Sequence, residues 1–190
     1  MLRHAIATMT SDNTQSPRIG ASFYWTLLAV VPLSFVLHEL AHWSAGELLG
    51  NDMVASLNHA YPRSGAYRSP GDAFIVDAAG PAFTLLQAMV AFALIRGRAL
   101  LLAYPVLFVA CFMRMAATFV SLFNPNDEAR MSVLLGWNMW VLPLLVVLSL
   151  LVLTLAASRS LRIGWKANAV SYLICSAIVA LIVLADARFT

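Results

Sequence analysis

The sequence predicts an all-α membrane protein with about five transmembrane helices. Of its 190 residues, 61% are hydrophobic and only 11% are charged, and the mean hydropathy is +0.81. A soluble domain carries about 25% charged residues, so this composition excludes an ordinary water-soluble fold. A helix needs roughly 20 mostly apolar residues to cross a bilayer, and several runs of the chain meet that length.

The apolar runs divide the chain into successive elements. Residues 1–20 are polar, and we expect them to form a flexible amino terminus. The apolar segments follow at residues 21–45, 76–95, 99–123, 137–157 and 167–185. The first of them is too long for the apolar part of a signal peptide, so we predict that it is retained as a span. Residues 21–130 are therefore expected to form a three-helix core, and residues 131–190 two additional transmembrane helices.

The connection between the first two apolar segments, residues 48–75, differs in composition from the rest of the chain. It is rich in residues that favour turns, namely Asn58, Pro62, Ser64, Gly65, Ser69, Pro70 and Gly71. Such clusters between periodic segments indicate loops or tight turns. We therefore predict an irregular loop or a short hairpin after the first helix.

The net charge of +3 and the pI of 9.2 do not indicate a nucleic-acid partner. The basic residues are few, and they lie between the apolar runs instead of clustering on one soluble face. We therefore expect the lipid bilayer, that of a prokaryotic cell membrane, as the surroundings. Cys111 and Cys175 both lie within apolar segments and have no metal-binding spacing, so the sequence predicts neither a disulfide framework nor a cysteine metal site.

The first apolar segment ends in residues that have the spacing of a metal site. His38, Glu39 and His42 form an HExxH motif. On a helix, two histidines four residues apart differ by about 40° in azimuth and by one turn in height, so both can bind one metal ion. Glu39 lies beside them, where it can take a proton from water. A structural histidine pair is the alternative, but three ionisable residues inside a membrane span are costly and favour a functional role.

A catalytic zinc ion takes three protein ligands and keeps one position for water. The candidates for the third ligand are His59, Asp52, Asp72, Asp77, Asp127 and Glu128. The first and third apolar segments run in the same direction, so their carboxyl ends lie on the same side of the membrane. Asp127 lies just past the third segment, after the helix-breaking residues Asn124 and Pro125. We therefore favour Asp127 as the residue that meets His38 and His42 at a similar depth.

These motifs, in this order, resemble the site-2 protease family of intramembrane metalloproteases. That family pairs HExxH on one transmembrane helix with a later Asn-Pro…Asp motif on another, and residues 123–127 (FNPND) look like the second motif. The family also has a Gly-Pro-containing motif at the head of the intervening helix, matched here by residues 79–84 (AGPAFT). We expect Gly80 and Pro81 to begin this helix and to allow close packing. The resemblance covers about residues 21–130.

The resemblance implies a function and a set of site residues. It implies a zinc metalloendopeptidase whose Zn²⁺ is held by His38, His42 and Asp127, with Glu39 as the catalytic base. The substrates would be transmembrane segments of other membrane proteins, and residues 21–130 would form the catalytic core. The chain would be a divergent, minimal member, because Glu128 stands where the family commonly has Gly and no loop can contain a regulatory domain.

Two considerations give opposite orientations in the membrane. The Lys and Arg residues expected on the amino-terminal side are Arg3, Arg18, Arg96, Arg98, Arg159, Arg162 and Lys166, and those expected on the other side are Arg63, Arg68, Arg130 and Arg188. Cytoplasmic loops carry an excess of these residues, so the distribution predicts a cytoplasmic amino terminus and a metal site toward the outside. The resemblance implies a zinc ion toward the cytoplasmic face. The sequence leaves both orientations open.

Four other polar residues have alternative interpretations. His59 can be a ligand or a substrate contact, but an ordinary loop histidine is favoured. Glu128 can orient the metal site or replace Asp127 as a ligand. Arg114 lies inside the third segment and can stabilise an oxyanion or pair with an acid such as Asp77. Equally, it can form a structural ion pair or extend its side chain toward the membrane interface. Asn124 can contact the substrate or the transition state, or it can be a turn residue before a proline.

Two other classes of membrane protein compete with a protease. A di-iron desaturase or hydroxylase uses many histidine ligands, and this chain has only 4 histidines. A metal-binding or inactive protease-like protein that acts as a binding partner is the second alternative. Glu39, the predicted base, is intact and favours activity.

Overall fold

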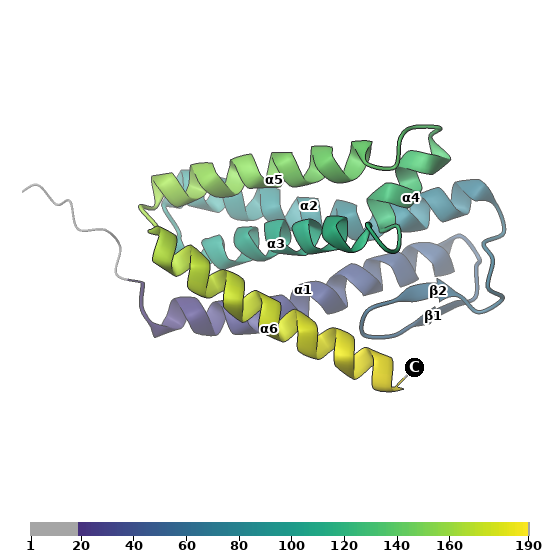
Figure 1. The fold of residues 1–190 in the computed structure, drawn as a ribbon, viewed down its shortest axis with the longest axis horizontal. Helices are drawn as coiled ribbons and strands as arrows, with labels where there is room; N and C mark the ends of the chain where they lie inside the picture. Colours follow the sequence, from purple (N-terminus) through teal and green to yellow (C-terminus); the bar gives the residue numbers. More distant parts are fainter. Residues whose placement is uncertain (1–18, 190) are drawn as a thin grey trace, which may run out of the picture.

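The computed structural model describes residues 19–189 of the chain (Figure 1). Within them are six α-helices: α1 (Ala21–Leu48), α2 (Pro70–Arg98), α3 (Tyr104–Val120), α4 (Asp127–Leu134), α5 (Val141–Ser160) and α6 (Trp165–Phe189). A short hairpin of strands β1 (Met53–Ala55) and β2 (Ala60–Pro62) follows α1, and a 3-10 turn (Leu101–Ala103) precedes α3. The predicted flexible amino terminus, residues 1–20, lies almost entirely outside the described residues.

Five of the helical segments are long and apolar enough to cross a membrane. They are α1, α2, α3 together with its preceding 3-10 turn, α5, and α6 as far as Arg188. The predicted all-α class is therefore confirmed, as is the short hairpin after the first helix. The two strands are antiparallel, with Val54 opposite Tyr61.

The four helices α1, α2, α3 and α5 lie alongside one another, and α6 runs obliquely across them (Figure 1). Apolar side chains fill the space between these helices, and Phe23, Ile95, Tyr104, Leu107 and Leu150 are at most 1% exposed. The hairpin and α4 lie at the same end of the bundle, next to the carboxyl end of α1 and the first turns of α2. The polar residues of the candidate site gather at this end.

Helix α2 begins earlier than the sequence predicted, at Pro70 instead of near residue 76. The Ser69 Oγ atom accepts a hydrogen bond from the Asp72 N–H group at 3.1 Å, which caps the helix. Pro70 occupies the first turn, where its missing N–H group costs nothing. The polar residues of this turn resembled a loop, so the predicted connection was too long.

Helix α4 was not predicted, and the third apolar segment, expected to reach residue 123, ends as α3 at Val120. The Asn126 side chain caps α4 by accepting a hydrogen bond from the Ala129 N–H group at 2.9 Å. Two acidic residues, Asp127 and Glu128, occupy its first turn, where negative charge favours the helix dipole. The third predicted ligand is therefore held at a helix start instead of in a free loop.

Two side-chain contacts attach the hairpin to the helices. The Glu47 carboxylate accepts a hydrogen bond from the Met53 N–H group at 2.8 Å, which joins β1 to α1. At the other end of the hairpin, His59 Nδ1 lies 3.0 Å from the carboxylate of Asp186 in α6. The same carboxylate accepts a hydrogen bond from the Leu57 N–H group at 2.9 Å. The hairpin is therefore held between the first and last helices.

Candidate metal centre

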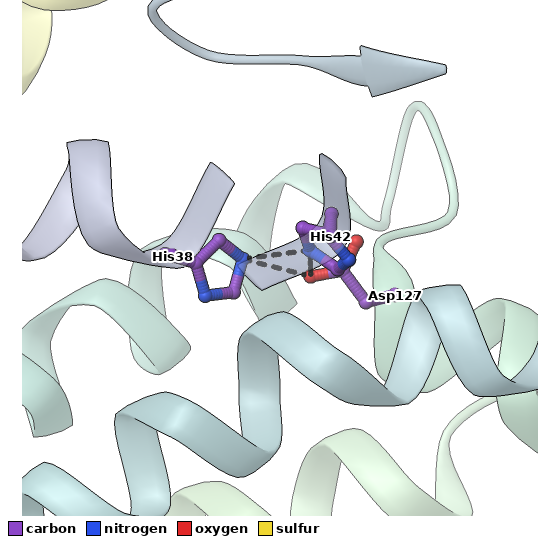
Figure 2. Close-up of side chains that lie close together, drawn as sticks. All are labelled: His38, His42 and Asp127. Atoms are coloured by element: carbon purple, nitrogen blue, oxygen red, sulfur yellow. Dashed lines mark hydrogen bonds and ion pairs between the residues drawn. The ribbon is translucent and has the colours of Figure 1, made fainter. Parts of the chain in front are cut away.

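Three side chains that are far apart in the sequence converge at this end of the bundle. His38 and His42 come from α1, and Asp127 is the first residue of α4. The two Nε2 atoms lie 3.1 Å apart, and Asp127 Oδ2 lies 3.2 Å from His38 Nε2 and 3.5 Å from His42 Nε2. Figure 2 shows the three side chains pointing toward one another. Together they form a group that can hold a metal ion.

Helix α2 orients both histidines through hydrogen bonds to their Nδ1 atoms. His42 Nδ1 donates a hydrogen bond to the Val76 carbonyl oxygen, which can only accept, at 2.6 Å. The Thr84 hydroxyl donates to the Gly80 carbonyl at 3.1 Å, so its oxygen is left to accept from His38 Nδ1, also at 3.1 Å. Each ring therefore carries its proton on Nδ1 and directs the lone pair of Nε2 at the other ligands, the arrangement usual for metal-binding histidines.

The chemistry of this atom set fits a cation. Two nitrogen lone pairs and a carboxylate oxygen face one another, and repulsion between them is relieved by a positive charge at their centre. Arg114 provides hydrogen-bond donors nearby, but its contacts to Asp127 Oδ2 and His38 Nε2 are 3.3 and 3.4 Å, long for charged hydrogen bonds. Ligands about 2.0–2.1 Å from a tetrahedral metal lie roughly 3.3 Å apart, close to the separations observed here.

Asp127 has the charge that a metal ligand needs. Burial by itself would raise the pKa of this carboxyl group. The positive charge of Arg114, whose guanidinium group donates to Oδ2 at 3.3 Å, and the 2.8 Å hydrogen bond from Arg130 to Oδ1 oppose the effect of burial, and the pKa of Asp127 lies well below its usual range. Asp127 is therefore ionised at neutral pH and available to a cation.

Gly80 allows α2 to approach the two histidines. A Cβ atom at this position would collide with His42 Nε2 and with the His38 ring. The predicted close packing at Gly80 and Pro81 is present, but the prediction that they begin the helix is wrong. Both lie well inside α2, which starts at Pro70.

Replacing Gly80 by Ala should disturb the metal site more than the fold. Helix propensity favours Ala by about 1 kcal/mol, whereas overpacking a filled site costs about 1–3 kcal/mol, so stability should fall by at most about 2 kcal/mol. We expect metal affinity to fall at least about tenfold, because the colliding atoms belong to the His38 and His42 rings. Thermal unfolding and metal titration in detergent measure the two effects.

The matched control for this prediction is Gly97→Ala, near the end of the same helix. Nothing lies within 4 Å of a Cβ atom built at Gly97. This variant should bind metal as the wild type does and be equally or slightly more stable. Wild-type metal affinity in Gly80→Ala would contradict the role assigned to Gly80.

Glu39 lies between the two histidines in the sequence and lines a cavity of about 660 Å³. His42 and Asp127 line the same cavity, as do Tyr61 and its neighbours on strand β2. Glu39 is 9% exposed. The cavity therefore brings the predicted base, two of the predicted metal ligands and a short strand to one space.

Arg114 does not make the ion pair with Asp77 that was considered from the sequence. Its side chain is 4% exposed, and its guanidinium group donates to Glu128 Oε1 at 3.0 Å and to Asp127 Oδ2 at 3.3 Å. Asp77 pairs with a different arginine, on α4. The alternative of a structural ion pair describes Arg114 correctly. Glu128 does not belong to the group of possible metal ligands.

The remaining candidates lie outside the metal group. His59 is in the hairpin with its side chain 63% exposed, and it pairs with Asp186 as described above. Asp52 pairs with Arg63 on the hairpin surface at 3.0 Å. Asn124 is exposed, and it lines a second cavity of about 270 Å³ together with Glu39.

Besides the Thr84 hydroxyl that orients His38, two features of the site were missed from the sequence. One is the Val76 carbonyl group, which orients His42 and has no signal in the side-chain sequence. The other is Arg130, which contacts both Asp77 and Asp127. Its position three residues after Asp127 on a helix was a usable signal, but α4 itself was not predicted.

Comparisons of the chain with protein-family models, with curated proteins and with solved structures found no match. The resemblance to the site-2 protease family therefore rests on the sequence motifs. The grouping of His38, His42 and Asp127 rests on the geometry of the described residues.

Proposed function

We propose that this chain is an intramembrane zinc metalloprotease that hydrolyses peptide bonds within or near the transmembrane segments of other membrane proteins. The observation that carries the proposal is the grouping of His38, His42 and Asp127, two of which line a cavity together with Glu39 and strand β2. The five apolar helices support a site inside or at the edge of the bilayer. The order of the sequence motifs adds independent support.

Zinc is the metal that suits the proposed reaction. Two imidazole nitrogens and one carboxylate oxygen make a typical three-ligand set for catalytic zinc, with a fourth position open. The same set also occurs around non-haem Fe(II) in oxygenases. Glu39, adjacent to His38 in an HExxH motif, is the base that hydrolysis needs, and it favours zinc.

The proposed chemistry divides between the metal and the side chains. Zn²⁺ bound by His38, His42 and Asp127 would activate water and polarise the peptide carbonyl. The Glu39 carboxylate accepts the proton that the attacking water releases, and it then donates this proton to the leaving amine nitrogen. Asn124, exposed on the second cavity beside Glu39, can donate a hydrogen bond to the substrate carbonyl.

Strand β2 suits an extended substrate. A peptide bond inside an intact helix is shielded, so the segment to be cut must first lose its helical hydrogen bonds. Residues Ala60, Tyr61 and Pro62 of β2 line the cavity that contains Glu39, and a peptide added to a sheet edge is held extended by main-chain hydrogen bonds. The proposed partner is therefore a transmembrane protein whose unwound segment lies along the hairpin.

The test uses the full chain purified in detergent and reconstituted in liposomes. Synthetic transmembrane peptides with a fluorophore and a quencher are the probe, and bound metal is measured by mass spectrometry. We expect about one zinc per chain, cleavage that a chelator lowers at least about 100-fold, and recovery when zinc is added back. Cleavage that survives complete removal of the metal would refute the proposal. Bound metal without cleavage of any peptide would favour the inactive, binding-partner alternative.

A further inference from the structure

We propose that Arg130, anchored by Asp77 of α2, is a positioning residue that holds Asp127 so that its Oδ2 atom alone faces the metal. This inference rests on the proposed metal site and concerns two residues to which that proposal assigns no role. It starts from the contacts of the Arg130 guanidinium group.

Every nitrogen of this guanidinium group has a partner. Nε lies 3.1 Å from both carboxylate oxygens of Asp77, and Nη2 lies 2.7 Å from Asp77 Oδ1. Nη2 also donates to Asp127 Oδ1 at 2.8 Å, and Nη1 donates to the Pro125 carbonyl oxygen at 3.0 Å. Bidentate arginine–carboxylate pairs of this kind fix direction as well as distance. The orientation of Arg130 is therefore determined by α2 and by the turn before α4.

The two oxygens of Asp127 consequently have separate tasks. Oδ1 accepts the short hydrogen bond from Arg130, while Oδ2 is the atom that faces the Nε2 atoms of His38 and His42. A carboxylate with one oxygen held in this way cannot rotate to offer both oxygens to a metal. The contact favours one-oxygen coordination and a low coordination number, which leaves room for water at a catalytic zinc.

Helix α2 then orients all three ligands although it contributes none of them. Val76 holds His42 through its carbonyl group, Thr84 holds His38 through its hydroxyl group, and Asp77 holds Asp127 through Arg130. Asp77 is 4% exposed, and a buried carboxylate is retained only when it is paired. Its pairing with Arg130 links the start of α4 to the same helix that supports the histidines. We refer to the contacts of Arg130 with Asp77 and Asp127 as the clamp.

The test measures metal binding by Arg130→Gln, Arg130→Lys and Asp77→Asn in the full-length protein. Loss of partners that orient metal ligands lowers affinity about 10–100-fold, so we expect this loss in Arg130→Gln and Asp77→Asn. Arg130→Lys keeps the charge without the two-pronged geometry, and it should lie between Arg130→Gln and the wild type. The absorption spectrum of the Co²⁺-loaded protein should shift toward higher coordination in Arg130→Gln. The double variant Arg130→Gln/Asp77→Asn should lose little more metal affinity than either single variant, because both residues act through Asp127.

The matched control is Arg63→Gln, which removes a 3.0 Å ion pair with Asp52 on the hairpin surface and should leave affinity and spectrum unchanged. If Arg130→Gln does not fold, the metal affinity of Asp77→Asn tests the inference instead, since this change alters the clamp without changing the side-chain size. Wild-type affinity and an unchanged Co²⁺ spectrum in the folded variant would overturn the inference.

The outcomes also separate this inference from the proposed function. A wild-type protein that binds zinc but cleaves no peptide would refute proteolysis, while the affinity series would still test the clamp. Cleavage by the wild type together with unchanged metal binding in Arg130→Gln and Asp77→Asn would refute only the clamp. A wild-type protein that binds no divalent metal would overturn both.

Discussion

Replacing Glu39 by Gln is expected to abolish peptide cleavage while the metal stays bound. Glu39 lines the cavity together with His42 and Asp127 but does not belong to the metal group. Gln has nearly the same size and cannot take a proton from water at neutral pH. A positioned general acid–base group contributes about 10²–10⁴-fold to rate, so the cleavage rate should fall by that factor. The cleavage rate and the zinc content of the same purified sample measure both parts of the prediction.

The matched control for Glu39→Gln is Glu47→Gln on the same helix. The Glu47 carboxylate accepts a hydrogen bond from the Met53 N–H group, and the carbonyl oxygen of Gln can accept the same bond. This variant should keep both metal and activity. If Glu39→Gln cleaved peptides at the wild-type rate, Glu39 could not be the base and the mechanism would be wrong.

Replacing Asp127 by Ala is expected to cause the largest loss of metal binding. The change removes the one ligand contributed by α4 and leaves only His38 and His42 facing each other. It also removes the ionised carboxylate that balances the charge of a divalent cation. The affinity for zinc should fall by more than the roughly 100-fold upper limit for outer partners such as Arg130. Zinc titration against a competing chelator measures the change, and cleavage should be lost with the metal.

Two further variants serve as a control for Asp127→Ala and as a test of the alternative ligand. Asp52→Asn neutralises an exposed carboxylate of the hairpin and should bind zinc normally. Glu128→Gln tests the alternative ligand considered from the sequence, and it should weaken binding less than Asp127→Ala does, since Glu128 lies outside the metal group. Stoichiometric zinc with wild-type affinity in Asp127→Ala would show that the third ligand has been assigned wrongly.

The fold could be predicted where the hydropathy of a long segment is enough to specify a helix. The five apolar segments are long enough to cross a bilayer, and each corresponds to a helix with ends that differ by a few residues. The prediction failed at residues 70–75 and 127–134, which are helical although charged residues, and Pro and Gly at the start of α2, interrupt their apolar residues. Both helix starts depend on a single capping side chain, Ser69 or Asn126. Such a contact is weaker evidence in a sequence than a long apolar run.

The two histidines of the candidate site could be predicted because they form a local pattern, whereas the residues around them could not because their contacts join distant parts of the chain. HExxH is a local pattern, and the helix period places its two histidines on one face whatever surrounds them. The pairing of Arg130 with Asp77 joins residues 53 positions apart, and the sequence does not specify the register between α4 and α2. Arg114 was correctly considered as a structural ion pair, but its partner, Glu128, depends on the turn between α3 and α4.

By itself, the sequence determined the apolar helices and the histidine pair of HExxH, and it favoured Asp127 as the third ligand, because hydropathy and short spacings are properties of the local chain. Only the tertiary structure decided how those residues are oriented. The Val76 carbonyl, the Thr84 hydroxyl and the Arg130 guanidinium orient His42, His38 and Asp127 in turn. These contacts depend on how α2 packs against α1 and α4. That packing is not specified by the side-chain pattern of any single segment.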